Sequence, residues 1–222
     1  MIDKRFKDLN EVVANLDALK DGATLLCSGF GGAGVPHGLF RAVLDLGLRD
    51  LTLVSNNAGS TDIDIAILLK AGCVRKVVCS FPRASGSKVF EELYAAGKIE
   101  LELVPQGTLA ERIRAGGAGI PAFFTATAYG TPLAEGKEVR EFNGRQYIME
   151  EAIRGDIALI HANEGDRWGN LTYPMTSRNF GPIMATAADH TIAEVRQFVD
   201  SIDPEVVVTP GIFVQRIVEV AA

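Results

Sequence analysis

The chain of 222 residues has few cysteines and no long apolar run. Cys27, Cys73 and Cys79 are odd in number and lack C-x-x-C spacing, so the sequence indicates neither a disulfide framework nor a zinc site. Buried, reduced thiols are expected instead. No window approaches 18 consecutive apolar residues, and the N-terminal residues lack the apolar core of a signal peptide. We therefore expect a cytoplasmic protein without a membrane partner.

Positive charge is also scarce. The sequence has 22 Lys and Arg against 28 Asp and Glu, which gives a net charge of −6. This balance disfavours nucleic acid as the main partner. Because 47% of the residues are hydrophobic, a chain of this length can bury a sizeable core. We expect one domain that spans residues 1–222.

The usual catalytic and nucleotide-binding groupings are missing. His37, His161 and His190 are scattered and form no H-x-x-x-H pair, so no metal site is predicted. No serine lies in G-x-S-x-G, and no Gly-Lys-Ser/Thr marks a phosphate-binding loop. Residues 29–34 match G-x-G-x-x-G only loosely, because the acidic residue expected about twenty positions later is absent. The sequence therefore predicts no attacking group in the chain itself.

The most distinctive stretch that is present runs from Cys27 to Pro36. It follows an apolar strand at 23–26 and precedes an amphipathic helix at 37–46. Glycine at four of the six positions 29–34 allows positive φ and close approach to a ligand, and the start of the next helix offers free N–H donors to an anion. Pro36 suits a first helical turn. The alternative is a tight strand-to-helix connection with no ligand.

Short apolar strands alternate with helical patterns through the first half of the chain. After a helix at 9–19, the expected elements are strands at 51–54, 76–79 and 99–104 and helices at 63–71, 89–96 and 108–114. This order is typical of α/β proteins. It predicts an open, mostly parallel sheet with helices on both faces and a ligand site at the carboxyl ends of the strands.

The second half has a different texture. Residues 138–148 alternate around Asn143-Gly144, which predicts a β-hairpin insertion. A strand at 157–162, a short strand at 171–173 and a helix at 183–188 follow. Strands at 191–195, 206–208 and 212–218 are expected to close the chain.

Three polar loops leave predicted strand ends, at 28–34, 55–59 and 105–108. Asn56, Asn57 and Gln106 donate hydrogen bonds without carrying charge, which suits a site that holds a carbonyl or a developing oxyanion. Asn and Gly also form ordinary turns, so each loop taken alone has a purely structural alternative. Their shared position at strand ends favours a site.

The same loops carry a resemblance to a known family. The segments concerned are Gly29 to Pro36, Ser55 to Gly59, Pro105 to Arg114, Gly116 to Gly119 and Gly165 to Tyr173. Together they resemble the A subunit of class I (3-oxoacid) CoA-transferases over essentially the whole chain. The resemblance implies a CoA-transferase fold, an α/β sheet like that of sugar-phosphate isomerases. Segments 74–82, 178–185 and 209–216 are most similar to 3-oxoadipate enzymes, whereas 138–144 also resembles succinyl-CoA:3-oxoacid enzymes.

In that family the nucleophile is a glutamate in an E-x-G context on the B subunit. This chain has no glutamate with glycine two positions later. The resemblance thus implies half of an active site, completed by a B subunit in an A2B2 assembly. It implies transfer of CoA from an acyl-CoA, such as succinyl-CoA, to a 3-oxo acid through a glutamyl-CoA thioester. No metal or organic cofactor is implied, since the coenzyme A thioester is itself a substrate.

The resemblance also implies roles for individual residues. Gln106 is the expected catalytic donor to the oxyanion. The expected substrate-binding and CoA-binding residues are Gly29, Phe30, Gly31, Gly32, Gly34, Asn56, Asn57 and Gly107. For a dicarboxylic acceptor such as 3-oxoadipate, Arg83 or Arg178 is a candidate partner of the distal carboxylate.

Three alternatives remain open from the sequence. The acceptor can be acetoacetate or acetate rather than 3-oxoadipate. A self-contained isomerase or hydrolase on the same sheet needs an internal base near the glycine loop, and no strong candidate is present. A ligand-sensing domain would bind its ligand without a partner chain.

Overall fold

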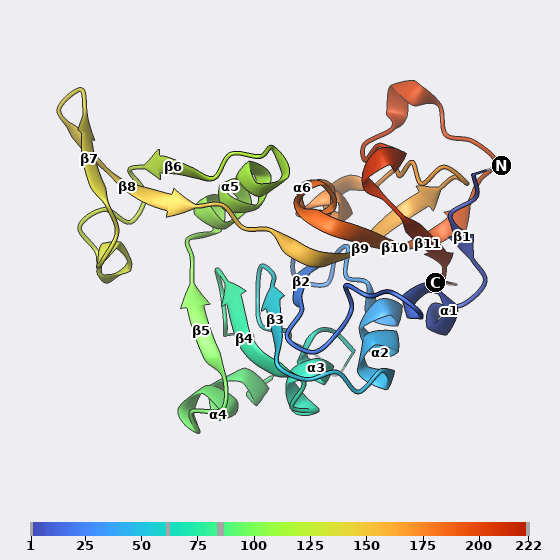
Figure 1. The fold of residues 1–222 in the computed structure, drawn as a ribbon, viewed down its shortest axis with the longest axis horizontal. Helices are drawn as coiled ribbons and strands as arrows, with labels where there is room; N and C mark the ends of the chain where they lie inside the picture. Colours follow the sequence, from blue (N-terminus) through green and yellow to red (C-terminus); the bar gives the residue numbers. More distant parts are fainter. Residues whose placement is uncertain (1, 61–62, 84–86, 221–222) are drawn as a thin grey trace.

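The computed structural model describes residues 2–60, 63–83 and 87–220 of the predicted domain. Its main element is an eight-stranded sheet in the order β1-β11-β10-β9-β2-β3-β4-β5 (Figure 1). Every pair of neighbours in this sheet runs parallel. The strands are β1 Arg5–Phe6, β2 Thr24–Cys27, β3 Leu51–Val54, β4 Val74–Cys79, β5 Glu100–Leu103, β9 Gly155–Gly165, β10 Ala188–Phe198 and β11 Arg216–Glu219.

The strand order reverses at β2. From β2 the chain moves outward through β3 and β4 to β5, and it later returns to β9 on the other side of β2. Leu26 of β2 is in register with Val54 of β3 and with Ala158 of β9. Because ligands of open parallel sheets gather where the strand order reverses, the loop after β2 lies in the favoured position for a site.

Helices cover both faces of the sheet (Figure 1). They are α1 Leu9–Val13, α2 His37–Asp45, α3 Ala66–Lys70, α4 Val89–Ala95, α5 Gln106–Gly117 and α6 Gly181–Ala187. Leu25 and Leu26 point to opposite faces of β2, as neighbours in a strand do. Leu25 joins the core under α1 to α4, and Leu26 joins the core under α5 and α6. Burial on both faces explains why these strands read as continuous apolar runs.

A small antiparallel sheet stands apart from the main body as an arm (Figure 1). It consists of β6 Ala122–Thr125, β7 Val139–Phe142 and β8 Arg145–Glu151, in the order β6-β8-β7. Asn143 and Gly144 have φ of 52° and 77°, as the tight turn of a hairpin requires. The predicted α/β fold with a hairpin insertion is therefore confirmed, and β6 is a strand that the sequence pattern did not reveal.

Several predicted boundaries are wrong. The first helix ends at Val13 rather than 19, because Ala14 is extended and Asn15 has a φ of 52°. Residues 171–173 contribute only two isolated bridges at Leu171, to Gly165 and to Thr209. In place of strands at 206–208 and at the start of 212–218, the chain forms 3-10 helices Pro204–Val206 and Gly211–Phe213 before β11. A proline at or just before each short helix fixes φ and removes a backbone donor, which favours a turn over a ladder.

The three thiols are free and buried, as expected from the sequence. Among the described residues, no helix is long and apolar enough to cross a membrane.

Candidate active site

The glycine loop between β2 and α2 is a short reverse turn with tied ends. Phe30 and Ala33 exchange backbone hydrogen bonds of 3.0 and 3.1 Å, so that Gly31 and Gly32 form the exposed tip. The N–H groups of this tip find no acceptor among the described residues, which leaves them free to donate to a ligand. Glycine is required at position 29, where φ is +133° and a Cβ would lie 2.7 Å from Val35 Cγ2.

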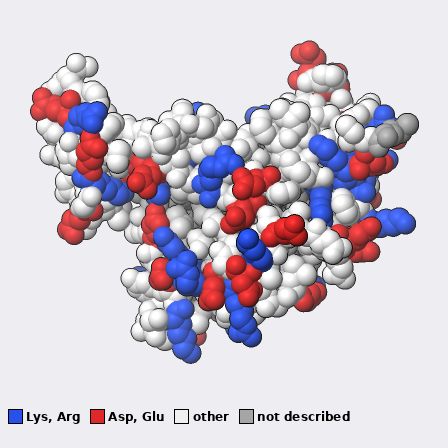
Figure 2. Space-filling model, in the orientation of Figure 1, with Lys and Arg blue, Asp and Glu red and all other residues white. Residues whose placement is uncertain are grey.

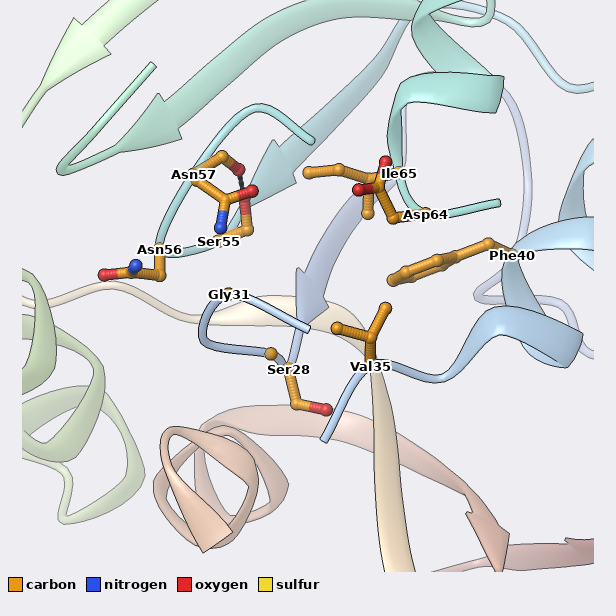
Figure 3. Close-up of a pocket in the computed structure, with 10 residues that line it drawn as sticks. Ser28, Gly31, Val35, Phe40, Ser55, Asn56, Asn57, Asp64 and Ile65 are labelled. Atoms are coloured by element: carbon orange, nitrogen blue, oxygen red, sulfur yellow. Dashed lines mark hydrogen bonds between the residues drawn. The ribbon is translucent and has the colours of Figure 1, made fainter. Parts of the chain in front are cut away.

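The loop after β3 presents two oriented amides. Asn56 is 7% exposed, and its Oδ1 accepts a 2.9 Å hydrogen bond from the hydroxyl of Ser80. Asn57 Oδ1 accepts from Gly59 N at 2.8 Å. In both residues the carbonyl oxygen of the amide is occupied, and the NH₂ group remains as a donor. Figure 3 shows Asn57 Nδ2 pointing toward Gly31 of the glycine loop.

The sequence placed Gln106 in a loop before the helix. In the structure it is instead the first residue of α5. Pro105 precedes it with extended backbone, and Leu109 N donates to Pro105 O at 2.8 Å. Since the first N–H groups of a helix lack intrahelical acceptors, the N-terminus of this 12-residue helix carries partial positive charge. The exposed amide of Gln106 and the N-terminus of α5 therefore both favour negative charge beside this first turn of the helix.

These three loops meet around a pocket of about 400 Å³ at the carboxyl ends of the parallel strands. Its lining residues are Phe30, Gly31, Asn56, Asn57, Ser60, Ser80, Phe81 and Gln106. The described wall thus offers amides, hydroxyls and peptide groups, and it includes no carboxylate, imidazole, thiol or amine. Such a wall can bind a carbonyl and stabilise an oxyanion, but it supplies no strong nucleophile.

The other predicted site residues lie around the same loop but not in this pocket. Gly29 lines a smaller cavity of about 20 Å³ beneath the loop, which also contacts Asn56 and Asn57 (Figure 3). Gly32 and Gly34 line a cavity of about 590 Å³ on the opposite side. Gly107 lines none of the three, and a Cβ there would meet nothing within 4 Å. The structure therefore brings together the amides and the loop tip, and it leaves Gly107 aside.

The nearby thiols are not nucleophiles. Burial raises the pKa of Cys79 to about 12, and it raises the pKa of Cys27 further still. Both groups are therefore protonated near neutral pH and unreactive. Neither lines the 400 Å³ pocket.

The two candidate arginines also lie outside the pocket wall. Arg83 is 80% exposed and its Nε forms an ion pair with Glu91 Oε1 at 3.2 Å. Arg178 is exposed at the end of the 3-10 helix Met175–Arg178. Neither is among the residues that line the pocket.

Two residues that hold the site were missed in the sequence. Ser80, directly after β4, orients the Asn56 amide, and its position at a fourth strand end was the available signal. Asp64 is 8% exposed and accepts hydrogen bonds from Ser60 N at 2.7 Å and Ala66 N at 2.9 Å. Its carboxylate holds the backbone of Ser60 and Ala66 through these hydrogen bonds, which the spacing of residues in the sequence does not predict.

Comparison with known proteins places the chain in a class. Residues 8–220 match the coenzyme A transferase family, and the chain belongs to that family. It is 57% identical to the A subunit of 3-oxoadipate CoA-transferase from Pseudomonas putida, over 100% of this chain and 95% of the relative. It is also 48% identical to the A subunit of a probable succinyl-CoA:3-ketoacid coenzyme A transferase from Bacillus subtilis, over 90% of this chain and 84% of that one. The resemblance seen in the sequence is confirmed, and the protein is a CoA-transferase.

Solved structures agree on the fold. A variant of the decarboxylase AibA/AibB gives a TM-score of 0.82 at 26% identity, over 99% of this chain and 84% of that chain. Glutaconate coenzyme A-transferase from Acidaminococcus fermentans gives 0.85 at 19% identity, over 98% of this chain and 76% of that chain. The same sheet thus supports more than one reaction, so the site must decide the chemistry.

Proposed function

We propose that this chain is the A subunit of a 3-oxoacid CoA-transferase that moves CoA from succinyl-CoA to 3-oxoadipate in the cytoplasm. The observation that carries the proposal is the pocket of about 400 Å³, whose described lining residues offer neutral donors and no nucleophile. A B subunit would supply the missing glutamate, in an A2B2 assembly. The names and high identities of the two relatives support both the reaction and the role of this chain in it.

The proposed reaction is a ping-pong exchange. The partner's carboxylate attacks the thioester carbonyl of succinyl-CoA, and the CoA thiolate leaves. The thiolate then attacks the glutamyl carbonyl of the mixed anhydride formed in that step, which releases succinate and leaves a glutamyl-CoA thioester. The same steps then run in reverse with the second substrate. The carboxylate of the 3-oxo acid attacks the glutamyl-CoA thioester, and the released thiolate converts the 3-oxo acid into its CoA thioester. Each thioester supplies its own activation, so the reaction calls for no further cofactor.

The residues of this chain act on the oxyanions of those steps. Gln106 would donate to the oxygen that becomes negative, aided by the N-terminus of α5. Asn56 and Asn57 would hold the substrate carbonyl or carboxylate through their NH₂ groups. Gly29, Phe30, Gly31, Gly32 and Gly34 would form the loop that approaches the acyl group and the pantetheine arm. A role for Gly107 rests only on its place beside Gln106.

The acceptor's distal carboxylate needs a cation from elsewhere. No Lys or Arg lines the described pocket wall, and the residues outside the described part contain neither. Arg83 and Arg178 lie outside the pocket wall, so their positions give no support for a contact with the distal carboxylate. We therefore propose that the B subunit supplies the cation together with the glutamate.

Reconstitution tests this function. The chain purified alone should fold but show no transferase activity, and addition of the B subunit should restore it. With the pair, kcat/KM for 3-oxoadipate should exceed that for acetoacetate. Turnover by the lone chain at the rate of the pair would refute the half-site, and a clear preference for acetoacetate would refute the acceptor.

A further inference from the structure

We propose that Asn179 is a positioning residue that fixes the glycine loop, residues 28–35, against the segment before α6. The proposal rests on the proposed function, in which this loop forms one wall of the acyl-transfer pocket. Asn179 lies about 150 positions away in sequence, and no described pocket residue is its neighbour in the chain. Its part in the reaction is therefore indirect, through the place of the loop.

The Asn179 side chain bonds to both limbs of the loop. Its Oδ1 accepts a 3.1 Å hydrogen bond from Gly29 N on the limb that leaves β2. Its Nδ2 donates a 3.1 Å hydrogen bond to Ala33 O on the limb that leads to α2. One amide thus closes the base of the reverse turn whose tip lines the pocket.

The same amide is anchored in its own segment. Oδ1 also accepts from Phe180 N at 2.7 Å, and Nδ2 also donates to Ser177 O at 3.0 Å and to Thr176 O at 3.2 Å. The oxygen faces only N–H donors and the nitrogen faces only carbonyl oxygens. Asparagine suits this set, since its two N–H hydrogens are shared among the three carbonyl oxygens, whereas aspartate would place a second oxygen against them.

The glycine loop and the segment before α6 are also closely packed. A Cβ on Gly34 would lie 2.5 Å from Asn179 Nδ2 and would also collide with Ser177 O. Gly34 has a φ of +67°, which favours glycine as well. The contact therefore has one tight geometry, set by the amide on one side and by the missing side chain on the other.

The opposite side of the loop is tied to the sheet. Ser28 Oγ donates to Gly34 O at 2.7 Å and accepts from His161 N of β9 at 3.1 Å. Asn179 supplies the tie on the other side. Without it the tip can shift, and a displacement of about 1 Å in a positioning group can cost up to about 100-fold in rate.

The test uses the enzyme assembled with its B subunit. Asn179→Ala and Asn179→Asp should each lower kcat by about 10- to 100-fold while KM for the acyl-CoA changes little and the pair still assembles. Asn10→Ala, on the exposed face of α1, is the matched control and should leave kcat unchanged. Near-normal kcat for both Asn179 variants, or a loss that follows from failed assembly, would overturn the proposal.

A double-mutant cycle separates a loop effect from a general loss of stability. Gly34→Ala breaks the same contact from the loop side, so the Asn179→Ala/Gly34→Ala double variant should be little worse than the poorer single variant. Additive losses in kcat would contradict a shared mechanism.

A readout without catalysis distinguishes this proposal from the proposed function. The N–H groups of Gly29, Phe30 and Ala33 are hydrogen-bonded in the loop. Their amide hydrogen exchange should become at least about tenfold faster in Asn179→Ala than in the parent or in Asn10→Ala, because the loop has lost its tie. Unchanged exchange would refute the positioning role. If the parent enzyme shows no CoA transfer, the proposed function is refuted, but the exchange measurement still tests whether Asn179 positions the loop.

Discussion

At the scale of single residues, the site consists of neutral amides whose direction is fixed by their neighbours. Ser80 engages the Asn56 carbonyl oxygen, Gly59 N engages that of Asn57, and the start of α5 places Gln106. A neutral donor stabilises an oxyanion without making the resting carboxylate substrates bind too tightly. The pocket is therefore suited to intermediates in which negative charge develops and is lost again at each attack on a carbonyl carbon.

Gln106→Ala should lower kcat by about 10²–10³ in the assembled enzyme, the usual loss for one preorganised oxyanion donor. Because the amide strengthens as charge develops, KM should change little. Steady-state kinetics with succinyl-CoA measure both. Gln146→Ala is the control, since Gln146 bonds to Glu141 on the arm rather than to the site. Near-normal kcat for Gln106→Ala would remove Gln106 from the reaction.

At the scale of elements, a chain of alternating charges attaches the arm to the main body. In the body, Lys76 and Arg112 contact Glu102 at 2.6 and 2.7 Å, and in the arm, Lys137 contacts Glu150 at 2.5 Å. Arg112 joins the two groups, since its Nη1 lies 3.9 Å from Glu150 Oε2. Burial by itself would raise the pKa of Glu102, but the hydrogen bonds from the two cations outweigh it and hold that pKa below its usual range. Figure 2 shows both signs of charge along the arm and the adjoining edge of the body.

Lys137→Met should lower the free energy of unfolding by about 1–3 kcal/mol, less than for a fully buried pair because Lys137 is 31% exposed. The reason is that Glu150, whose side chain is 2% exposed, loses its 2.5 Å partner. Urea unfolding of the isolated chain measures the change. Lys20→Met, at an exposed lysine, should stay within about 0.5 kcal/mol of the parent. Equal stability of both variants would show that the Lys137–Glu150 ion pair does not stabilise the arm.

At the scale of the whole molecule, the open pocket has an apolar rim that a second chain would cover. Phe81 is 61% exposed and Phe30 is 46% exposed, and both line the pocket. Large exposed aromatics beside a site that lacks a nucleophile are typical of an interface. The proposed assembly would bury them, together with more than about 1,000 Å² in total.

Phe81→Asp should raise the dissociation constant for the B subunit by at least about tenfold, because it places a charge in a surface that must be dehydrated. Analytical ultracentrifugation or calorimetry of the mixed subunits measures it. Leu46→Asp is the control, since Leu46 is 42% exposed at the far end of α2, beyond the amino ends of the strands. Equal weakening by both variants would mean that the rim is not the interface.

The sequence by itself determined the class of fold and which polar loops lie at the carboxyl ends of the strands. Apolar runs such as Leu51–Val54 had to be buried strands, and glycine, asparagine and glutamine directly after such runs had to lie at one edge of a parallel sheet. The absence of an E-x-G glutamate was visible as well, because such a local pattern is either present or absent in a sequence. These features are encoded by residues close together in the chain.

Only the tertiary structure decided which groups hold the site in place. Three features depend on partners far away in sequence: the end of α1, where Arg216 donates to Val12 O and Ala14 O, the strand β6, which pairs with β8, and the contact of Glu150 with Arg112. The same holds for Asn179, whose amide bonds to Gly29 across 150 positions. Local sequence propensity cannot predict such contacts, because they form only when folding brings the partner residue within hydrogen-bond distance.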